Sequence, residues 1–195
     1  MTDTSPIKIL AFSGSLCRDS YNKQLVSIAS EGARKAGAEV TLIDFRDYPM
    51  PFYDGDLQQS EGFPQGAGKF KKLMLEHHGF LIASPEYNMS MTAVLKNAID
   101  WASRSAAGES PLSAFRGKVA ALMTTSPGYF GGIRGLSHLR LVLEACGTMV
   151  LPEQIAVPKA SVAFTADGRL SEGKQHDSVE KLGASVANLL LKLHR

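Results

Sequence analysis

Short apolar runs alternate with longer amphipathic stretches along almost the whole of this 195-residue chain. The apolar runs are bounded by Gly, Ser, Pro or Thr, and the stretches between them carry apolar residues at helical spacing. Strands that alternate with helices lie parallel in one sheet, with helices on both of its faces. The pattern therefore predicts an α/β fold with five strands, at residues 7–12, 39–44, 79–84, 117–124 and, in two pieces around Pro152, 148–151 and 154–157.

Five helices are expected between and after these strands. They cover residues 21–35, about 64–78, 91–103, 132–145 and about 172–193, and Gly37 is expected to cap the first of them. The segment from residue 48 to residue 70 is rich in Pro, Gly and acidic residues, and its first part is predicted to be a long loop. Because the length suits one domain, we expect residues 1–195 to form a single one.

Composition argues against several classes of protein. A net charge of +2 gives no basic field for nucleic acid, and 44% hydrophobic residues are typical of a globular domain. Cys17 and Cys146 are far apart, and the adjacent His77 and His78 do not share a helix face, so neither a disulfide framework nor a metal site is expected. Residues 1–5 show no signal-peptide pattern, and no apolar run is long enough to span a bilayer. We expect a cytoplasmic protein without nucleic-acid or membrane partners.

Ligands of open parallel sheets bind beyond the carboxyl ends of the strands, which directs attention to the loops at residues 13–22, 84–90 and 125–132. The first loop leads into the first helix, where free backbone N–H groups and the helix dipole favour a phosphate. Ser15, Ser20 and Asn22 add side-chain donors, and Arg18 adds positive charge beside Tyr21. Ordinary helix capping by Ser20 or Asn22 is the alternative, and this loop alone does not decide between them.

The other two loops suit a flat aromatic ligand. Pro85 fixes the backbone, Tyr87 can supply an aromatic wall, and the backbone amides of Glu86, Tyr87 and Asn88 can bind a ring edge. In the third loop, Gly128 and Gly131 allow close approach of the backbone beside Ser126. Neither a P-loop nor a GxGxxG motif follows the first strand, which argues against nucleotide sites of those two kinds.

Three stretches of the sequence together resemble the NADPH-dependent FMN reductase family, which includes quinone, chromate and azo-dye reductases. The first is the serine-rich loop from Gly14 to Asn22. The second is Pro-Glu-Tyr-Asn at 85–88 followed by Leu-Lys-Asn-Ala-Ile-Asp-Trp at 95–101, and the third runs from Ser126 to Arg140. The order and spacing match over nearly the whole chain. Two positions depart from the pattern: Cys17 stands where the family has arginine, and Met89 where it has glycine.

The resemblance implies a flavodoxin-like three-layer α/β/α sandwich with a five-stranded parallel sheet in the order 2-1-3-4-5. It implies bound FMN, with NADPH or NADH as electron donor. The acceptor would be a small molecule: a quinone, chromate, an azo compound or free flavin. Because the cofactor carries the chemistry, no catalytic acid or base is expected. The residues expected to bind the cofactor are Ser15, Arg18, Ser20, Tyr21, Asn22, Pro85, Glu86, Tyr87, Asn88, Ser126, Gly128 and Gly131.

The alternative to an enzyme is a flavodoxin-type electron carrier without turnover of its own, which the near-neutral charge disfavours. A homodimer or homotetramer is expected, because the helix at 92–101 presents Val94, Leu95, Ala98 and Trp101, more apolar surface than one side of a sheet needs. Cys17 is either a reactive thiol at a helix N-terminus or a neutral substitution, and we favour the second. Asp44 is interpreted as a solvated acid at the end of a strand.

Overall fold

The computed structural model describes residues 6–194, so the expectation for residues 1–5 lies outside the described part of the chain. Its sheet contains β1 (Lys8–Ser13), β2 (Glu39–Ile43), β3 (Gly79–Ala83), β4 (Val119–Thr125) and β5 (Met149–Val157). The strands lie in the order β2-β1-β3-β4-β5, and all neighbouring pairs are parallel. The predicted fold class and strand order are confirmed. Strands β1, β3 and β4 are almost wholly buried, which explains why they are continuous apolar runs.

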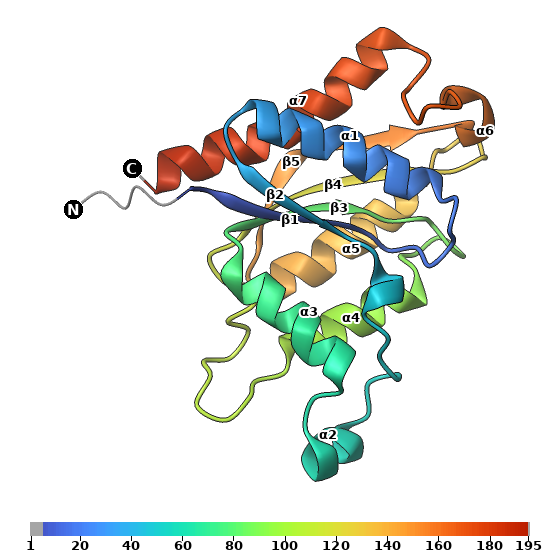
Figure 1. Cartoon of the computed structure of the whole chain (residues 1–195). Helices are drawn as coiled ribbons and strands as arrows, with labels where there is room; N and C mark the ends of the chain where they lie inside the picture. The colour runs from blue at the N-terminus through green and yellow to red at the C-terminus, as the bar shows by residue number, and fades with distance from the viewer. Residues whose placement is uncertain (1–5, 195) are drawn as a thin grey trace.

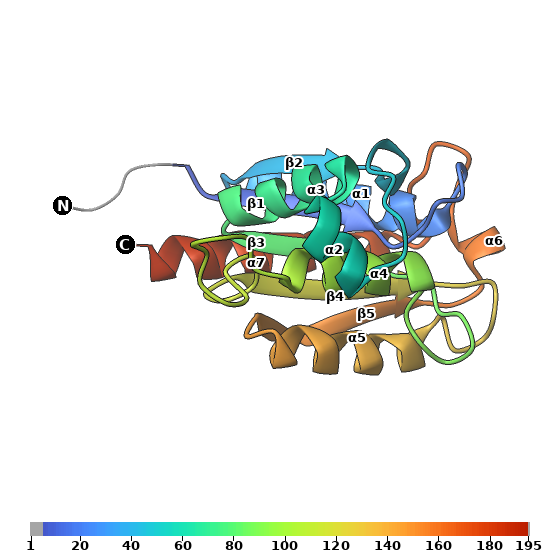
Figure 2. The same ribbon diagram turned by 90° about the horizontal axis from the view of Figure 1, so that it is seen from below.

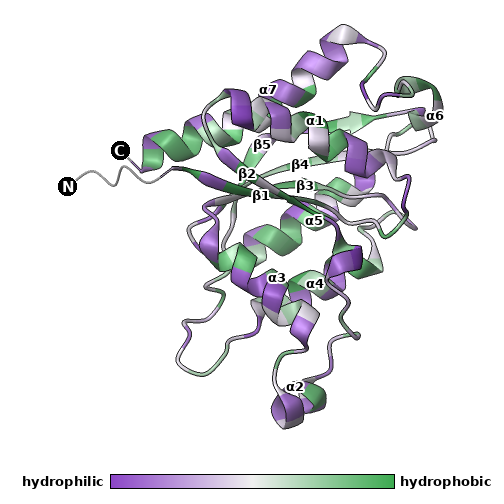
Figure 3. Cartoon of the chain, in the orientation of Figure 1, coloured by the Kyte–Doolittle hydropathy of each residue, from purple (hydrophilic) through white to green (hydrophobic). Residues whose placement is uncertain are grey.

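Helices cover both faces of the sheet (Figures 1 and 2). One face carries α1 (Tyr21–Lys35) and α7 (Gly173–Leu193), and the other carries α3 (Gln65–Glu76), α4 (Ala93–Ser103) and α5 (Ile133–Ala145). Figure 3 shows the hydrophobic side of these helices turned largely toward the strands. Two separate apolar clusters result, one on each side of the sheet. The sheet is therefore the middle layer of a three-layer sandwich.

Helices α1 and α7 touch through their backbones. A Cβ atom on Gly32 would lie 1.9 Å from the carbonyl oxygen of Glu180, and one on Gly183 would lie 1.8 Å from that of Ala29. No side chain fits at either position. This close contact fixes α1 against the fold, and with it the loop that enters α1 from β1.

Several local features differ from the sequence-based expectations. Strand β5 runs through Pro152 without a break, and the interruption is instead a shift in its register with β4. Three short elements were not predicted: the 3-10 helix η1 (Phe45–Asp47), α2 (Gly55–Glu61) and α6 (Ala160–Ala163). Helix α2 has no buried residue, so it carries no apolar periodicity, and the Asp54 carboxylate caps it. Among the described helices, none has the length and apolar character needed to cross a bilayer.

Candidate functional site

The three predicted loops converge at the carboxyl edge of the sheet and form a pocket of about 280 Å³, here called the loop pocket. Residues of all three loops line it, and four of them, Cys17, Asp19, Thr125 and Pro127, were not among the predicted binding residues. Eight of the predicted residues are in its lining, whereas Arg18, Asn88, Gly128 and Gly131 are not. The full lining is Ser15, Cys17, Asp19, Ser20, Tyr21, Asn22, Pro85, Glu86, Tyr87, Thr125, Ser126 and Pro127.

Ser20 stands at the start of α1 and faces this pocket. The residue is only 9% exposed, and its hydroxyl makes no capping hydrogen bond to the helix. The alternative of ordinary capping by Ser20 is therefore not what the structure adopts. The first turn of α1 contains no acidic residue, and its leading N–H groups have no partner inside the helix. A hydroxyl that faces a pocket beside unpaired N–H groups is suited to an anion.

Ser15 is held in the same loop. Its Oγ accepts a hydrogen bond from the backbone N–H of Cys17 at 3.2 Å, and the residue is buried. The loop is also anchored from outside, because the Thr92 hydroxyl donates to the carbonyl oxygen of Gly14 at 2.6 Å and accepts from the N–H of Leu95. Sequence reasoning missed this role of Thr92. The signal was present, since Thr before a helical run is a common N-cap.

Asn22 has a different role from the expected side-chain donor. Its amide nitrogen donates to the carbonyl oxygen of Thr125 at 2.9 Å, and its amide oxygen accepts from the N–H of the same residue at 3.0 Å. These buried bonds clamp the start of α1 to the end of β4. Tyr21 also lines the pocket, but its ring stacks on Phe164 with centroids 5.4 Å apart. Both residues line the pocket while their side chains hold neighbouring segments in place.

The second loop is a tight hairpin turn. The N–H of Tyr87 donates to the carbonyl oxygen of Ser90, and the N–H of Ser90 donates back to Tyr87, at 2.9 and 3.1 Å. The Tyr87 amide is therefore engaged within the turn, contrary to its expected role at a ring edge. Asn88 and Met89 have φ values of +52° and +66°, as the two central residues of a type I′ turn require. Tyr87 itself is 55% exposed, so its ring is free to stack against a flat ligand in the pocket.

Met89 explains the glycine that the family pattern carries at this position. The left-handed backbone conformation costs a side chain such as methionine about 1–2 kcal/mol, whereas glycine adopts it freely. Met89 is also 56% exposed, whereas Met91 is buried.

Glu86 connects the second loop to the start of α5, the helix that follows the third loop. Its carboxylate accepts hydrogen bonds from Nε of Arg134 at 2.9 Å and from the N–H of Gly135 at 3.0 Å, and only 6% of the side chain is exposed. Burial raises the pKa of Glu86, but the Gly135 N–H and the Arg134 guanidinium outweigh it and hold the pKa below its ordinary value. The ionised Glu86 side chain therefore ties the second loop to the first turn of α5.

In the third loop, Ser126 faces the pocket, but the two glycines do not line it. Gly131 has a φ of +61°, and a Cβ atom there would lie 2.9 Å from the backbone nitrogen of Pro158. The close approach at Gly131 is therefore to the chain leaving β5. Gly128 accepts a hydrogen bond from the N–H of Lys159 through its carbonyl oxygen, at 3.2 Å, which ties this loop to the same segment.

Arg18 is exposed, and no ion pair or hydrogen bond of its side chain occurs among residues 6–194.

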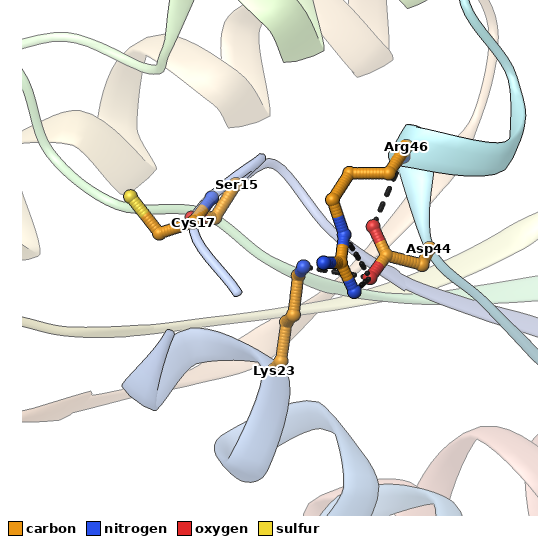
Figure 4. A network of polar contacts seen from close by, with 5 residues as sticks. All are labelled: Ser15, Cys17, Lys23, Asp44 and Arg46. Carbon is orange, nitrogen blue, oxygen red and sulfur yellow. Dashed lines mark hydrogen bonds and ion pairs between the residues drawn. The ribbon is translucent and has the colours of Figure 1, made fainter. Parts of the chain in front are cut away.

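Asp44 behaves differently from the expected solvated acid. Its Oδ2 accepts hydrogen bonds from Lys23 Nζ and from the guanidinium of Arg46, both at 2.7 Å (Figure 4). Burial raises the pKa of Asp44, but hydrogen bonds from Arg46 and Lys23 outweigh it and hold the pKa far below its usual range. A hollow of about 370 Å³ beside this network has its main charges already paired, so the loop pocket is the better candidate site.

Helix α4 holds the long connection after β2. The Asn97 side chain donates to the carbonyl oxygen of Pro51 and accepts from the N–H of Tyr53, each at 2.8 Å, and Trp101 Nε1 also donates to Pro51 at 2.8 Å. Leu95 and Trp101 are wholly buried in their own chain. The apolar surface of this helix is therefore no evidence for an oligomer, because it is buried within the single chain.

The sequence of residues 7–162 matches the family model described as NADPH-dependent FMN reductase. The chain belongs to this family. An NAD(P)H-dependent FMN reductase of Pseudomonas aeruginosa is 37% identical over 90% of both chains. A quinone reductase of Escherichia coli strain K12 is 34% identical over 74% of this chain and 73% of that one. Among solved structures, the flavoenzyme NAD(P)H:(acceptor) oxidoreductase FerB of Paracoccus denitrificans has a TM-score of 0.80 with 26% identity, over 95% of this chain and 98% of that one.

Membership of the FMN reductase family confirms the resemblance inferred from the three loops. It also confirms the predicted class of activity, an oxidoreductase that uses FMN with NAD(P)H as electron donor and a small molecule as acceptor. The electron-carrier alternative is set aside, because the family and these relatives are reductases.

Proposed function

We propose that this FMN reductase holds FMN in the loop pocket and uses it to reduce quinones. The single observation that carries the proposal is Ser20, a residue only 9% exposed whose hydroxyl makes no capping bond and faces the loop pocket at the N-terminus of a 15-residue helix. A phosphate monoester there would accept hydrogen bonds from that hydroxyl and from the leading N–H groups of α1. The names of relatives from Escherichia coli and Solanum tuberosum, quinone reductase and NAD(P)H:quinone oxidoreductase, support the choice of acceptor.

Different residues of the pocket would bind the phosphate and the ring of FMN. Ser15, Ser20 and the backbone at Tyr21 and Asn22 would bind the phosphate, and Arg18 would add its unpaired charge from the rim. Pro85, Glu86 and Tyr87 would form one side of the ring slot and Ser126 the other, while Asn88, Gly128 and Gly131 would set the shape of the two loops outside this lining. Bound FMN supplies the hydride acceptor for NAD(P)H and the electron donor for the quinone. The protein binds it, orients it and excludes water from the ring.

Exposed aromatic side chains around the pocket support the exclusion of water. Tyr87 is 55% exposed on the second loop, and Tyr129 and Phe130 are 79% and 59% exposed on the third. Tyr129 and Phe130 are in edge-to-face contact, and the Arg134 guanidinium lies over the Phe130 ring at 5.1 Å. Such side chains can close over a flat ligand, because aromatic rings stack on one another.

We also propose a single cytoplasmic FMN-binding domain that forms a homodimer or homotetramer. A hollow of about 680 Å³ between the Tyr87–Ser90 turn and α5 supports this, because apolar side chains dominate its rim. Leu141 is 65% exposed there, and Met89, within the turn itself, is 56% exposed. An exposed apolar patch of this kind marks a protein interface.

The test of function compares Ser20→Ala with Ser27→Ala, a matched control further along α1. Loss of a hydroxyl that binds a charged phosphate should weaken FMN binding by about ten- to a hundredfold. The Ser27 control should change it by less than about twofold. Flavin-fluorescence titration gives both dissociation constants, and NAD(P)H oxidation with benzoquinone gives turnover. Equal affinities in the two variants, or no benzoquinone-dependent oxidation, would contradict the proposal.

A further inference from the structure

Cys17 lies in the wall of the loop pocket. It is exposed, and it lines the same pocket as Ser15 and Ser20. Its backbone N–H is fixed by the bond to Ser15 Oγ at 3.2 Å. Figure 4 shows its sulfur directed away from the network of Lys23, Asp44 and Arg46. The thiol is therefore held at the pocket and is free of the nearest charged cluster.

Ser20 gives an independent reason to expect a ligand beside this thiol. Its hydroxyl lacks a partner although the residue is 9% exposed, and it opens into the same pocket of about 280 Å³. A hydroxyl that opens into a pocket and makes no bond within the protein is available to a hydrogen-bonding ligand. The anion that satisfies Ser20 and any group attached to the Cys17 sulfur would therefore compete for one small space.

We propose that Cys17 is a thiol-modification site under the control of FMN: bound FMN covers the thiol, and a modified Cys17 excludes FMN. The inference rests on the proposed function, because it takes the loop pocket as the phosphate site. The two effects have one cause, because the ligand and the adduct would occupy the same space and each would exclude the other. A negatively charged adduct opposes the phosphate by repulsion as well as by volume.

The natural reagent that suits this chemistry is hydrogen peroxide. The thiolate sulfur attacks one peroxide oxygen, the O–O bond breaks, and the products are cysteine sulfenic acid and water once the released hydroxide takes up a proton. The sulfur loses two electrons and the peroxide gains them. In the test, iodoacetate replaces peroxide: an S–C bond forms, the C–I bond breaks and iodide leaves, which gives a stable carboxymethyl group of negative charge.

Cys146 provides an internal control. It is the other cysteine of the chain, lies at the end of α5 away from the lining of the loop pocket, and is half-buried. Burial raises the pKa of the Cys146 thiol, so this sulfur should react slowly. Its rate should not depend on FMN.

The experiment alkylates the protein with iodoacetate before and after saturation with FMN and follows each cysteine by peptide mass spectrometry. FMN should slow alkylation of Cys17 by at least about tenfold and leave the rate at Cys146 unchanged. The carboxymethylated protein should bind FMN at least about tenfold more weakly in a flavin-fluorescence titration. The Cys17→Ser variant should bind FMN equally before and after treatment, whereas Cys146→Ser should lose affinity as the wild type does.

Two outcomes are negative, and they differ. If FMN binds saturably but Cys17 reacts at the same rate with and without it, the inference is overturned and the proposed function stands. If FMN does not bind saturably to the untreated protein, the proposed function fails and the inference fails with it.

Discussion

Glu86 and Arg134 form an ion pair between the second pocket loop and the first turn of α5: the carboxylate accepts from Nε of Arg134 at 2.9 Å. The same carboxylate accepts from the N–H of Gly135 at the start of α5, at 3.0 Å. The sequence motif that contains Glu86 therefore serves first to position the loops. Its carboxylate turns toward α5, and the exposed Tyr87 ring is left beside the pocket.

Replacing Glu86 with glutamine should lower the free energy of unfolding by about 1–2 kcal/mol, because a nearly buried charge-assisted bond is lost while one neutral bond can remain. The same change should weaken FMN binding, since the two loops are no longer braced. Glu144→Gln is the matched control. Glu144 pairs with Arg140 on the surface of α5 at 3.5 Å, so its loss should cost less than about 0.5 kcal/mol. Urea unfolding of both variants measures the difference, and equal losses would contradict this role.

The depressed pKa of Glu86 predicts how stability responds to acid. A carboxylate whose pKa is lower in the folded state adds stability above its unfolded pKa of about 4.3, and this contribution is lost as the pH falls through the folded pKa. Stability should therefore fall between about pH 6 and pH 3, and less steeply in Glu86→Gln because one titrating group is gone. Urea unfolding at several pH values checks this. Identical pH slopes in the variant and the wild type would show that Glu86 titrates alike in both states.

Met89→Gly should stabilise the protein by about 1 kcal/mol, because the φ of +66° is strained for methionine and free for glycine. Asn88→Gly is the control in the same turn. Asparagine tolerates the left-handed region, so that change should be close to neutral despite a φ of +52°. Thermal unfolding of the two variants separates them. A Met89→Gly protein less stable than the wild type would show that the methionine side chain contributes more than its backbone costs.

Arg18→Ala should weaken FMN binding by about ten- to a hundredfold if this guanidinium reaches the phosphate, as we expect from its lack of another partner in residues 6–194. The control is Arg34→Ala, at the far end of α1, where the guanidinium pairs with Glu31. Flavin-fluorescence titration measures both. A loss under about threefold in Arg18→Ala would indicate that this arginine points to solvent and that the phosphate relies on the N–H groups of α1 and on Ser15 and Ser20.

Local patterns were enough to predict most of the fold. The bounds of α1 (Tyr21–Lys35) match the expected helix. Gly37 follows its end with a φ of +93°, and its N–H donates a hydrogen bond to the carbonyl oxygen of Arg34. These features depend on residues close in sequence. Helix α2 was missed, because it buries no residue and so has no apolar spacing to detect.

The detail of the site was less predictable, because it depends on contacts between distant residues. Asn22 was expected to face the phosphate, yet it bonds Thr125, 103 residues away. For Glu86 only the backbone amide was given a role, and the bond of its side chain to Arg134, 48 residues away, was not predicted. In each case the residue type suited either role, and only the packing of loops from different strands decides between them. The apolar face of α4 was misjudged for the same reason, since the segment that covers it contains Pro51 and Tyr53.

The most direct test of the account is anaerobic mixing of NAD(P)H with protein reconstituted with FMN, followed by visible absorbance. We expect about one FMN per chain, with mass spectrometry identifying the released chromophore as FMN and not FAD, because the proposed site has a single phosphate-binding loop. The bound flavin should be bleached by NAD(P)H much faster than free FMN, and benzoquinone should restore its colour. A flavin that binds but is bleached no faster than free FMN, or a chromophore identified as FAD, would contradict the account.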